Sequence, residues 1–295
     1  MDSNLRVESI GKREGPSGLA IHVKRAFVIG HPIAHSRSPL IHTHWLETHG
    51  IAGSYTAMDV APDALPDFFA EFRAGAFVGG NVTVPHKPAA FAAADSRDPL
   101  AETIGAVNTL VRRPDGLFGF NTDYLGFLGN LDQAAPGWDT GLGAAIVLGA
   151  GGAARAILVA LRARGVPRIH LLNRTPANAA ALATALGGPI AAGALADFDR
   201  LAPRAGLVVN CSTVGMHGTR FESLDVTRLP PGAVVNDLVY VPLDTPLLAA
   251  AREAGLRAVD GLGMLLHQAV PGFEAWFGVR PAVTPALRAL VEATL

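Results

Sequence analysis

The sequence predicts an α/β fold with two domains, and three observations support this prediction. Short apolar runs alternate with amphipathic segments along most of the chain, a pattern typical of strands and helices arranged in layers. The chain has 295 residues, which suggests two domains at about 150 residues each. Hydrophobic residues make up 49% of the chain, enough to fill the cores of both domains.

From Arg25 onward the first region alternates strands and helices. One expected helix, SPLIHTHWLETHG, has Ser38 at its N-cap, Pro39 at its first position and Gly50 as its stop. AVNTLVRR and LFGFNTD predict a hairpin that turns at residues 114–116. The expected strands are 25–30, 54–60 and 77–84, and the expected helices are 38–50 and 61–75.

A second region begins near Asp123 and contains short runs rich in Val, Ile and Leu. Such runs are expected of parallel strands that are buried on both faces. Alanine-rich helical patterns lie between them. The expected strands are 144–149, 168–173, 206–212, 233–240 and 257–260, and the expected helices are 153–165 and 176–188. Two further helical patterns follow at 261–278 and 281–295.

The composition excludes several kinds of partner. The net charge is −1 and the pI is about 6.8, so we expect no basic surface for nucleic acid or anionic lipid. A single cysteine, Cys211, excludes an internal disulfide and suits a reducing cytosol. No window resembles a membrane span, and the first 24 residues lack the apolar core of a signal peptide. We therefore expect a cytoplasmic protein that binds neither nucleic acid nor membranes, with residues 1–24 as a partly disordered tail.

A glycine-rich segment, GAGGAA at 149–154, directly follows the strand run AAIVL and opens a helix. It fits the pattern G-x-G-x-x-A, with Gly149, Gly151 and Ala154 in the small-residue positions. The first glycine permits a tight turn, the second lets backbone N–H groups approach a pyrophosphate, and the third position lets helix and strand pack closely. The segment predicts a Rossmann-type dinucleotide site. The alternative is a tight strand–helix turn that binds nothing.

The end of the next strand indicates which dinucleotide is bound. An NAD enzyme usually has Asp or Glu there, which accepts hydrogen bonds from the ribose 2′-hydroxyl. This chain has Asn173-Arg174-Thr175 instead. A guanidinium matches a 2′-phosphate in charge and geometry, so the sequence favours NADP over NAD. The alternative is that Arg174 is an ordinary solvated arginine.

A lysine at the end of GGNVTVPHK is the candidate general acid for hydride chemistry, because a carbonyl reduced by hydride also needs a proton. Only Lys12, Lys24 and Lys87 are lysines, and the first two lie in or near the expected tail. Lys87 is therefore the only lysine expected in the folded body. Asp123, at the junction of the two regions, is a plausible carboxylate partner. The alternatives are a surface-loop lysine and an aspartate that caps the following helix.

In combination these motifs resemble the shikimate dehydrogenase family over about residues 26 to 280. The shared segments are GHPIAHSRSP, GGNVTVPHK, GAVNT, NTDYLGF, GAGGAARA, NRT, DLVYVPLDTPLL and GLGMLLHQA, in matching order and spacing. The resemblance implies NADPH-dependent reduction of 3-dehydroshikimate to shikimate, in the pathway to aromatic amino acids. It also implies an active site in the cleft between two domains. Residues 25–122 and 261–295 would bind the substrate, and residues 123–260 would form the Rossmann-type NADP-binding domain.

The resemblance also assigns roles to individual residues. The catalytic acid–base pair would be Lys87 and Asp123. Substrate contacts fall to Ser36 and Ser38 at the carboxylate, to Thr83, Asn108 and Gln268 at the ring hydroxyls, and to Tyr240 close to the substrate. Cofactor contacts fall to Gly149, Ala150, Gly151, Gly152, Ala153, Asn173, Arg174, Thr175, Met216, Gly261 and Met264.

Four of the substrate residues have a local alternative. Ser38 is also the expected N-cap, and Thr83 is a β-branched residue that suits any strand. Asn108 fits a turn, and Gln268 fits the polar face of a helix.

One segment departs from the family pattern. Family members often carry a second arginine a few residues after NRT, where this chain has Pro176-Ala177-Asn178. A site with one guanidinium instead of two predicts a preference for NADP with a smaller margin.

Five histidines lie within residues 31–49. Two of them, His42 and His44, are two apart on a helix and face different directions, and no cysteine or carboxylate cluster accompanies them. We therefore expect no metal site. His86, beside the candidate lysine, is either a neighbour whose charge tunes that lysine or a solvated loop histidine.

Two rival functions remain open. A quinate or dual quinate/shikimate dehydrogenase would share the scaffold, but quinate carries an extra hydroxyl at the carboxylate-bearing carbon and needs added room. Serine at both positions, Ser36 and Ser38, favours shikimate. A non-catalytic NADP-binding regulatory protein would not need the Lys87–Asp123 pair. A monomer or a homodimer is expected.

Overall fold

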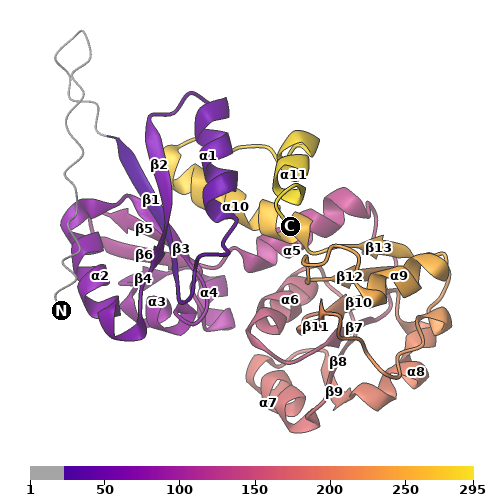
Figure 1. Ribbon diagram of the computed structural model, residues 1–295. Helices are drawn as coiled ribbons and strands as arrows, with labels where there is room; N and C mark the ends of the chain where they lie inside the picture. The colour runs from indigo at the N-terminus through magenta and orange to yellow at the C-terminus, as the bar shows by residue number, and fades with distance from the viewer. Residues whose placement is uncertain (1–22) are drawn as a thin grey trace.

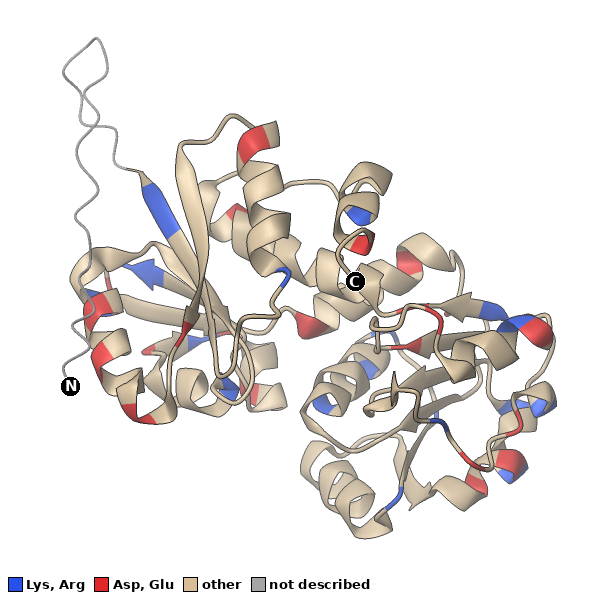
Figure 2. Ribbon diagram, viewed as in Figure 1, with Lys and Arg blue, Asp and Glu red and all other residues tan. Residues whose placement is uncertain are grey.

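A computed structural model describes residues 23–295 and shows two lobes, each built on a six-stranded sheet (Figure 1). Of the expected tail, residues 1–22 lie outside the described part of the chain. Lys24 opens the first strand, so the expectation that Lys87 is the only lysine in the folded body is wrong. No helix within residues 23–295 is long and apolar enough to cross a membrane. Basic and acidic residues are scattered over both lobes (Figure 2).

The first sheet has the strand order β2-β1-β3-β5-β6-β4. Its strands are β1 (Lys24–Gly30), β2 (Gly53–Asp59), β3 (Gly79–Val82), β4 (Ser96–Arg97), β5 (Thr109–Arg113) and β6 (Gly116–Phe120). Strand β1 pairs in parallel with β2 and β3, and β5 pairs antiparallel with β3 and β6. The predicted hairpin is confirmed, since β5 and β6 meet around Gly116, whose φ of 127° suits glycine.

Helices cover both faces of this sheet. They are α1 (Ser38–Thr48), α2 (Leu65–Glu71), α3 (Lys87–Ala93), α4 (Pro99–Ile104), α10 (Leu262–Phe277) and α11 (Pro285–Glu292). Alternate residues of β1 serve opposite faces, as the two-residue period of a strand requires. Ala26 and Val28 pack with α1, α10 and α11. Phe27 and Ile29 pack with residues of α2, α3 and α4, among them Phe68.

The second sheet is parallel throughout, with the order β13-β12-β10-β7-β8-β9. Its strands are β7 (Ala145–Leu148), β8 (Ile169–Asn173), β9 (Ile190–Ala194), β10 (Leu207–Asn210), β12 (Val234–Asp237) and β13 (Arg257–Val259). This arrangement confirms the parallel strands that the apolar runs predict. A short strand, β11 (Val214–His217), lies outside both sheets.

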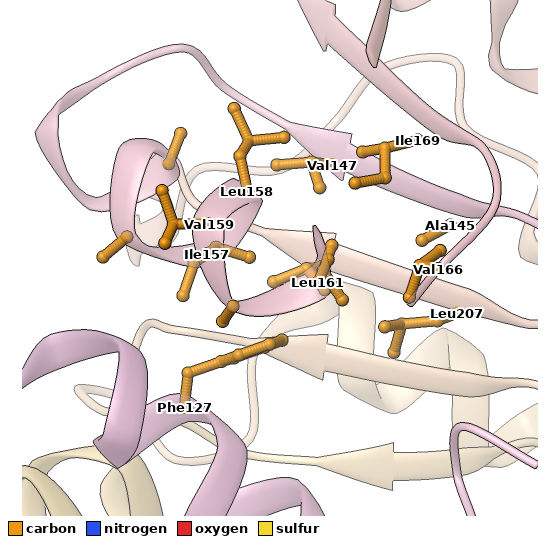
Figure 3. Close-up of a cluster of buried hydrophobic side chains, with 14 of the residues drawn as sticks. Phe127, Ala145, Val147, Ile157, Leu158, Val159, Leu161, Val166, Ile169 and Leu207 are labelled. Carbon is orange, nitrogen blue, oxygen red and sulfur yellow. The ribbon is translucent and has the colours of Figure 1, made fainter. Parts of the chain in front are cut away.

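Two layers of helices enclose the second sheet. They are α5 (Asp123–Ala134), α6 (Gly152–Ala163) and α7 (Pro176–Leu186) on one face, and α8 (Phe198–Leu201) and α9 (Pro246–Glu253) on the other. The first face holds a fully buried cluster that includes Val147, Ile157 and Leu161. Figure 3 shows Ile157 and Leu161 of α6 between Val147 of the sheet and Phe127 of α5.

The chain passes between the lobes twice, first through α5 and later from β13 into α10. These two helices pack closely against one another. Gly126 of α5 allows this approach, because a Cβ there would lie 2.6 Å from the Met264 carbonyl oxygen. The packed pair joins the two lobes, and both helices begin at the space between them.

The strands that the sequence does not predict are β4, β9 and β11. Strand β4 has two residues, and β9 has the sequence IAAGA. Two residues are too few to show a strand pattern, and alanine and glycine are poor strand formers, so neither segment carries a signal. Both are edge strands, placed by a single neighbour, β6 or β8.

His42 is a fully buried histidine in the core of the first lobe. Its ring stacks on Tyr55 with centroids 4.0 Å apart. Within residues 23–295 neither ring nitrogen has a hydrogen-bond partner. Burial lowers the pKa of His42 to about 3, and the neighbouring Asn81 amide offsets part of this effect.

This histidine should destabilise the fold in acid. The unfolded chain binds a proton at His42 below a pKa of about 6.5, whereas the folded chain binds it only near pH 3. Stability is therefore lost as the pH falls from 6.5 towards 3. Between pH 7 and pH 5 we expect His42 to remove about 2 kcal/mol from the free energy of unfolding.

Urea unfolding of the wild type and of His42→Phe at both pH values measures this contribution. Other titrating groups are common to the two proteins, so the difference between them isolates His42. The variant should lose about 2 kcal/mol less than the wild type on acidification. Equal losses in both proteins would show that His42 does not titrate in this way.

Candidate active site

A cavity of about 310 Å³ lies between the two lobes. Residues from both lobes line it, and they include every substrate and catalytic residue that the sequence suggests. The lining from the first lobe includes Ser36, Arg37, Ser38, Asn81, Thr83, Lys87 and Asn108, and Asp123 joins it from the start of α5. The lining from the second lobe and from α10 includes Ala153, Leu238, Tyr240, Gly261, Met264 and Gln268.

An ion pair between Lys87 and Asp123 stands in this cavity. The Lys87 Nζ donates to the Asp123 Oδ2 over 2.5 Å, and the side chains are 27% and 15% exposed. Lys87 is the first residue of α3 and Asp123 is the first residue of α5. A pair that is sheltered but still open to the cavity can hold and transfer a proton to a bound molecule.

The positions of these two residues exclude their local alternatives. Lys87 begins a helix and faces the cavity, so it is not a surface-loop lysine. Thr122, and not Asp123, occupies the N-cap of α5. The backbone N–H of Asp123 donates to the Asn121 Oδ1 over 2.9 Å, which leaves the Asp123 carboxylate free to face Lys87.

Asn108 holds the other carboxylate oxygen of Asp123. Its Nδ2 donates to the Asp123 Oδ1 over 2.8 Å, and its Oδ1 accepts from the Thr122 backbone N–H over 2.8 Å. The Thr109 hydroxyl also donates to the Asn108 Oδ1, over 2.9 Å. Asn108 is 3% exposed, so these bonds fix its orientation. The sequence gives no sign of this second role beside the expected substrate contact.

The segment Ser36-Arg37-Ser38 forms one wall of the cavity. The structure corrects the expected N-cap, because Arg37 occupies that position and makes no side-chain cap. The backbone N–H of Ser38 donates to the Ser36 Oγ over 3.3 Å. The Ser38 side chain is therefore free of the capping role, and it is buried beside the cavity.

Two residues behind this wall were missed from the sequence, Tyr55 and Asn81. The Tyr55 hydroxyl donates to the Asn81 Oδ1 over 2.6 Å, and the Asn81 Nδ2 donates to the Thr109 Oγ1 over 3.1 Å. Burial raises the pKa of Tyr55 well above its ordinary value, and contacts with Ser38 and Asn81 offset part of the effect. An asparagine within the otherwise apolar GGNV strand is the signal that would have drawn attention to Asn81.

The remaining predicted substrate residues close the cavity from other sides. Thr83 follows β3, and its backbone N–H donates to the Ile29 carbonyl over 2.9 Å. Gln268 on α10 accepts a weak bond from the Thr122 hydroxyl at 3.4 Å. Tyr240 follows β12 in the second lobe, and burial raises the pKa of its hydroxyl. The structure therefore brings all three to the cavity with Lys87.

The structure excludes one of the two sequence-based alternatives for His86. This residue is 2% exposed, so it is not a solvated loop histidine. Its Nε2 lies 2.7 Å from the Val60 carbonyl oxygen, and its backbone N–H donates to the Thr83 carbonyl over 2.8 Å. The side chain therefore anchors the turn that carries Thr83 and Lys87.

A second hollow, of about 540 Å³, lies at the carboxyl ends of β7, β8 and β10. Most of the predicted cofactor residues line it: Gly149, Ala150, Gly151, Gly152, Asn173, Arg174 and Thr175. It also includes Asn178, Cys211, Ser212 and Thr213, which the sequence analysis missed. Ligands of open parallel sheets bind at carboxyl strand ends, so the segment NCST after the β10 run carried a usable signal.

The glycine-rich turn has the shape that a dinucleotide needs. Gly149 has a φ of +99°, and a Cβ there would lie 3.1 Å from the Ser212 backbone nitrogen, so only glycine fits. A Cβ on Gly151 or Gly152 would meet nothing within 4 Å, which leaves an open cradle at the start of α6. Unpaired N–H groups at a helix N-terminus attract a pyrophosphate.

The other four predicted cofactor residues lie outside the second hollow. Ala153, Gly261 and Met264 line the cavity that holds Lys87. Met216 lies in β11 and lines neither hollow. Arg174 is exposed at the start of the turn after β8 and lines the second hollow. Among residues 23–295 no group of three or more His, Cys, Asp or Glu side chains is placed to hold a metal ion.

Comparisons with known proteins agree with this geometry. Residues 28–110 match the family model described as shikimate dehydrogenase substrate binding domain. Residues 140–246 match shikimate / quinate 5-dehydrogenase, and residues 261–291 match the shikimate 5'-dehydrogenase C-terminal domain.

Individual proteins match over nearly their whole lengths. A solved shikimate 5-dehydrogenase from Thermus thermophilus, in complex with NADP(H) and shikimate, is 40% identical with a TM-score of 0.81, covering 92% of this chain and 100% of the other. A quinate dehydrogenase from Corynebacterium glutamicum in complex with NAD is 29% identical with a TM-score of 0.83, over 92% and 99%. A shikimate dehydrogenase (NADP(+)) of Mesorhizobium japonicum is 58% identical over 272 residues, which are 92% of this chain and 97% of that protein. The chain therefore belongs to the shikimate dehydrogenase family.

Proposed function

We propose that this protein is an NADP-dependent shikimate dehydrogenase, an oxidoreductase that interconverts shikimate and 3-dehydroshikimate. The Lys87–Asp123 pair carries this proposal, because it places a proton donor inside a cavity between the two lobes. The relative from Mesorhizobium japonicum carries the same name at 58% identity. The same reaction would place the enzyme in aromatic amino acid biosynthesis, and we propose that it acts in the cytoplasm.

The chain's own residues supply the proton and hold the proton donor in position. NADPH, when bound, supplies the hydride for the ketone carbon. The Lys87 ammonium donates a proton to the oxygen that gains charge, and it takes the proton back in the reverse direction. Asp123 holds the ammonium in place, and Asn108 fixes the Asp123 carboxylate.

The substrate assignments follow from positions in the cavity. We infer that Ser36 and Ser38 bind the carboxylate. Thr83, Asn108 and Gln268 would contact ring hydroxyls, and Tyr240 would contact the substrate from the second lobe. Their presence in one cavity supports these roles.

The cofactor assignments place the dinucleotide along the second lobe. We infer that the Gly149–Ala153 turn binds the pyrophosphate and that Asn173, Arg174 and Thr175 hold the adenosine end. Gly261 and Met264 would line the nicotinamide side, because they face the cavity that holds Lys87.

The two sheets support a division into a substrate-binding domain, 25–122 with 261–295, and an NADP-binding domain, 123–260. Helix α5, which begins at residue 123, packs against both α6 and α10. The boundary at 123 is therefore proposed at a helix that both domains share.

Two rival functions are less well supported. A quinate dehydrogenase shares this fold, but three relatives that are 58%, 56% and 52% identical to this chain bear the name shikimate dehydrogenase (NADP(+)). A regulatory NADP-binding protein would not need an ion pair with the geometry of Lys87 and Asp123.

An assay of shikimate and quinate oxidation, each with NADP and with NAD, tests the proposal. Formation of reduced cofactor is followed by its absorbance. We expect shikimate with NADP to give the highest kcat/KM. A higher kcat/KM with quinate would assign the protein to the rival function. No oxidation of either compound would contradict the enzymatic function altogether.

Cofactor preference gives a separate prediction. Arg174 is the only arginine that lines the adenosine end of the second hollow within residues 23–295, and Asn178 lies in the same lining. We expect NADPH to be preferred over NADH, and Asn178→Arg to raise the ratio of their kcat/KM values by about tenfold, the effect of one added charged hydrogen bond.

Kinetics with both cofactors for the wild type and for Asn178→Arg measure this ratio. Asn178→Gln is the matched control, because it lengthens the side chain without adding charge. Equal kcat/KM values for NADPH and NADH in the wild type would show that Arg174 does not select the phosphate.

A further inference from the structure

The charged side chains that line the substrate cavity do not all have a partner of opposite charge. Among the described residues that line it, the arginine, lysine and aspartate side chains are Arg37, Lys87 and Asp123. Lys87 and Asp123 neutralise one another across 2.5 Å. Of these three side chains, Arg37 alone has no ion-pair partner among the described residues.

Arg37 is held in place without being neutralised. It is half-buried between Ser36 and Ser38, and its Nη2 donates to the backbone carbonyl of Thr294, just after α11. A carbonyl oxygen is uncharged, so this bond fixes the guanidinium and leaves its charge in full. The other N–H groups of a guanidinium stay available, because it carries five donors in a planar fork.

The guanidinium also acts across the cavity. Its positive charge lowers the pKa of the Tyr240 hydroxyl in the second lobe, against the larger effect of burial, which raises it. Arg37 and Tyr240 line the same cavity, and Arg37 lies between Ser36 and Ser38 in the chain. A carboxylate bound at Ser36 and Ser38 would therefore lie next to Arg37.

We propose that Arg37 determines specificity for an anionic substrate, by supplying the charge that recognises a carboxylate held by Ser36 and Ser38. This inference rests on the proposed function, since it takes the carboxylate of shikimate as the group recognised. The two serine hydroxyls are neutral donors, and a guanidinium adds a positively charged donor whose planar fork matches a carboxylate. The Thr294 carbonyl is the anchor that keeps the guanidinium at this wall.

Comparison of shikimate with its methyl ester isolates the role of Arg37, because the ester removes the charge and keeps the ring. In Arg37→Gln we expect kcat/KM for shikimate to fall by about 10- to 100-fold, the loss typical of a charged hydrogen bond. Most of this fall in kcat/KM should come from a higher KM for shikimate. The ester should lose less than threefold, and Arg37→Lys should recover part of the activity on shikimate.

Controls separate this role from a general loss of structure. Arg280→Gln removes another arginine of the same lobe, exposed and paired with Glu274, and should leave both substrates unaffected. The KM for NADP should not change in Arg37→Gln. Equal losses on shikimate and on the ester would overturn the proposal, and so would a rise confined to the KM for NADP.

A separate experiment tests the hydrogen bond between Arg37 and the Thr294 carbonyl. Removal of Thr294 and Leu295 should raise the KM for shikimate in the wild-type background, by less than Arg37→Gln does. In the Arg37→Gln background the same truncation should have no further effect, because both changes act on one interaction. Additive effects would show that Thr294 acts independently of Arg37.

Binding measurements keep this inference distinct from the proposed reaction. Calorimetric titration of the wild type and of Arg37→Gln with shikimate and with its ester needs no turnover. The wild type should prefer the acid, and the variant should lose most of that preference. An unchanged preference would contradict the role of Arg37 even if shikimate oxidation is confirmed. The expected change would support it even if turnover is absent.

Discussion

Lys87→Ala is expected to lower kcat for shikimate oxidation by about 100- to 10,000-fold, the usual contribution of a positioned proton donor. The KM for shikimate should change little, because the proton transfer of Lys87 is made mainly in the transition state. Steady-state kinetics with shikimate and NADP measure both quantities.

The other described lysine provides the matched control. Lys24 is exposed at the start of β1, far along the strand from the cavity lining. Lys24→Ala should keep wild-type kinetics, and both variants should unfold at about the wild-type temperature. Turnover near that of the wild type in Lys87→Ala would refute its catalytic role.

Asp123→Asn is expected to lower kcat by about 100-fold or more. The replacement keeps the size of the side chain, but it removes the charge that holds Lys87 at 2.5 Å and presents an amide to the ammonium. Lys87 and Asp123 should act as one unit. The double variant Lys87→Ala/Asp123→Asn is therefore expected to be no slower than Lys87→Ala alone.

The four proteins of this double-mutant cycle are compared by kcat under one set of conditions. Asp132→Asn is a suitable control, because Asp132 lies on the same helix, α5, and pairs with Arg164 outside the cavity. Losses that add in the double variant would show that Asp123 acts on catalysis independently of Lys87.

The second lobe could be predicted well because its signals are local. Parallel strands buried on both faces appear as continuous apolar runs, and β7, β8, β10, β12 and β13 follow them. The GAGGAA turn combines a strand end, a positive φ at Gly149 and a helix start within six residues. Each of these features depends on neighbours in the sequence.

The details of the cavity depend on contacts that no local pattern records. Tyr55 meets Asn81 from a position 26 residues away, and Arg37 meets Thr294 from 257 residues away. The buried His86 ring contacts the backbone carbonyl of Val60, which lies 26 residues earlier in the chain. The sequence motif that contains each residue could therefore be recognised. The residue that it contacts could be identified only from the three-dimensional fold.

Ser38 shows how a correct local rule can give the wrong role. Serine before a proline at a helix start is a strong N-cap signal, yet Arg37 occupies that position. The Ser38 side chain instead lies at the cavity, near the Tyr55 hydroxyl. Departures from a local preference often mark functional sites, and this serine lies beside the proposed carboxylate site.

A crystal structure of the complex with NADPH and shikimate, two reduced compounds that cannot react together, tests the proposed active site most directly. The hydroxyl at ring position 3 should lie within about 2.6–3.2 Å of the Lys87 Nζ, and its carbon about 3–3.5 Å from C4 of the nicotinamide. The carboxylate should lie at Ser36, Arg37 and Ser38. A ring turned the other way, with its carboxylate at Lys87 and its hydroxyls at the serines, would contradict the proposed mechanism.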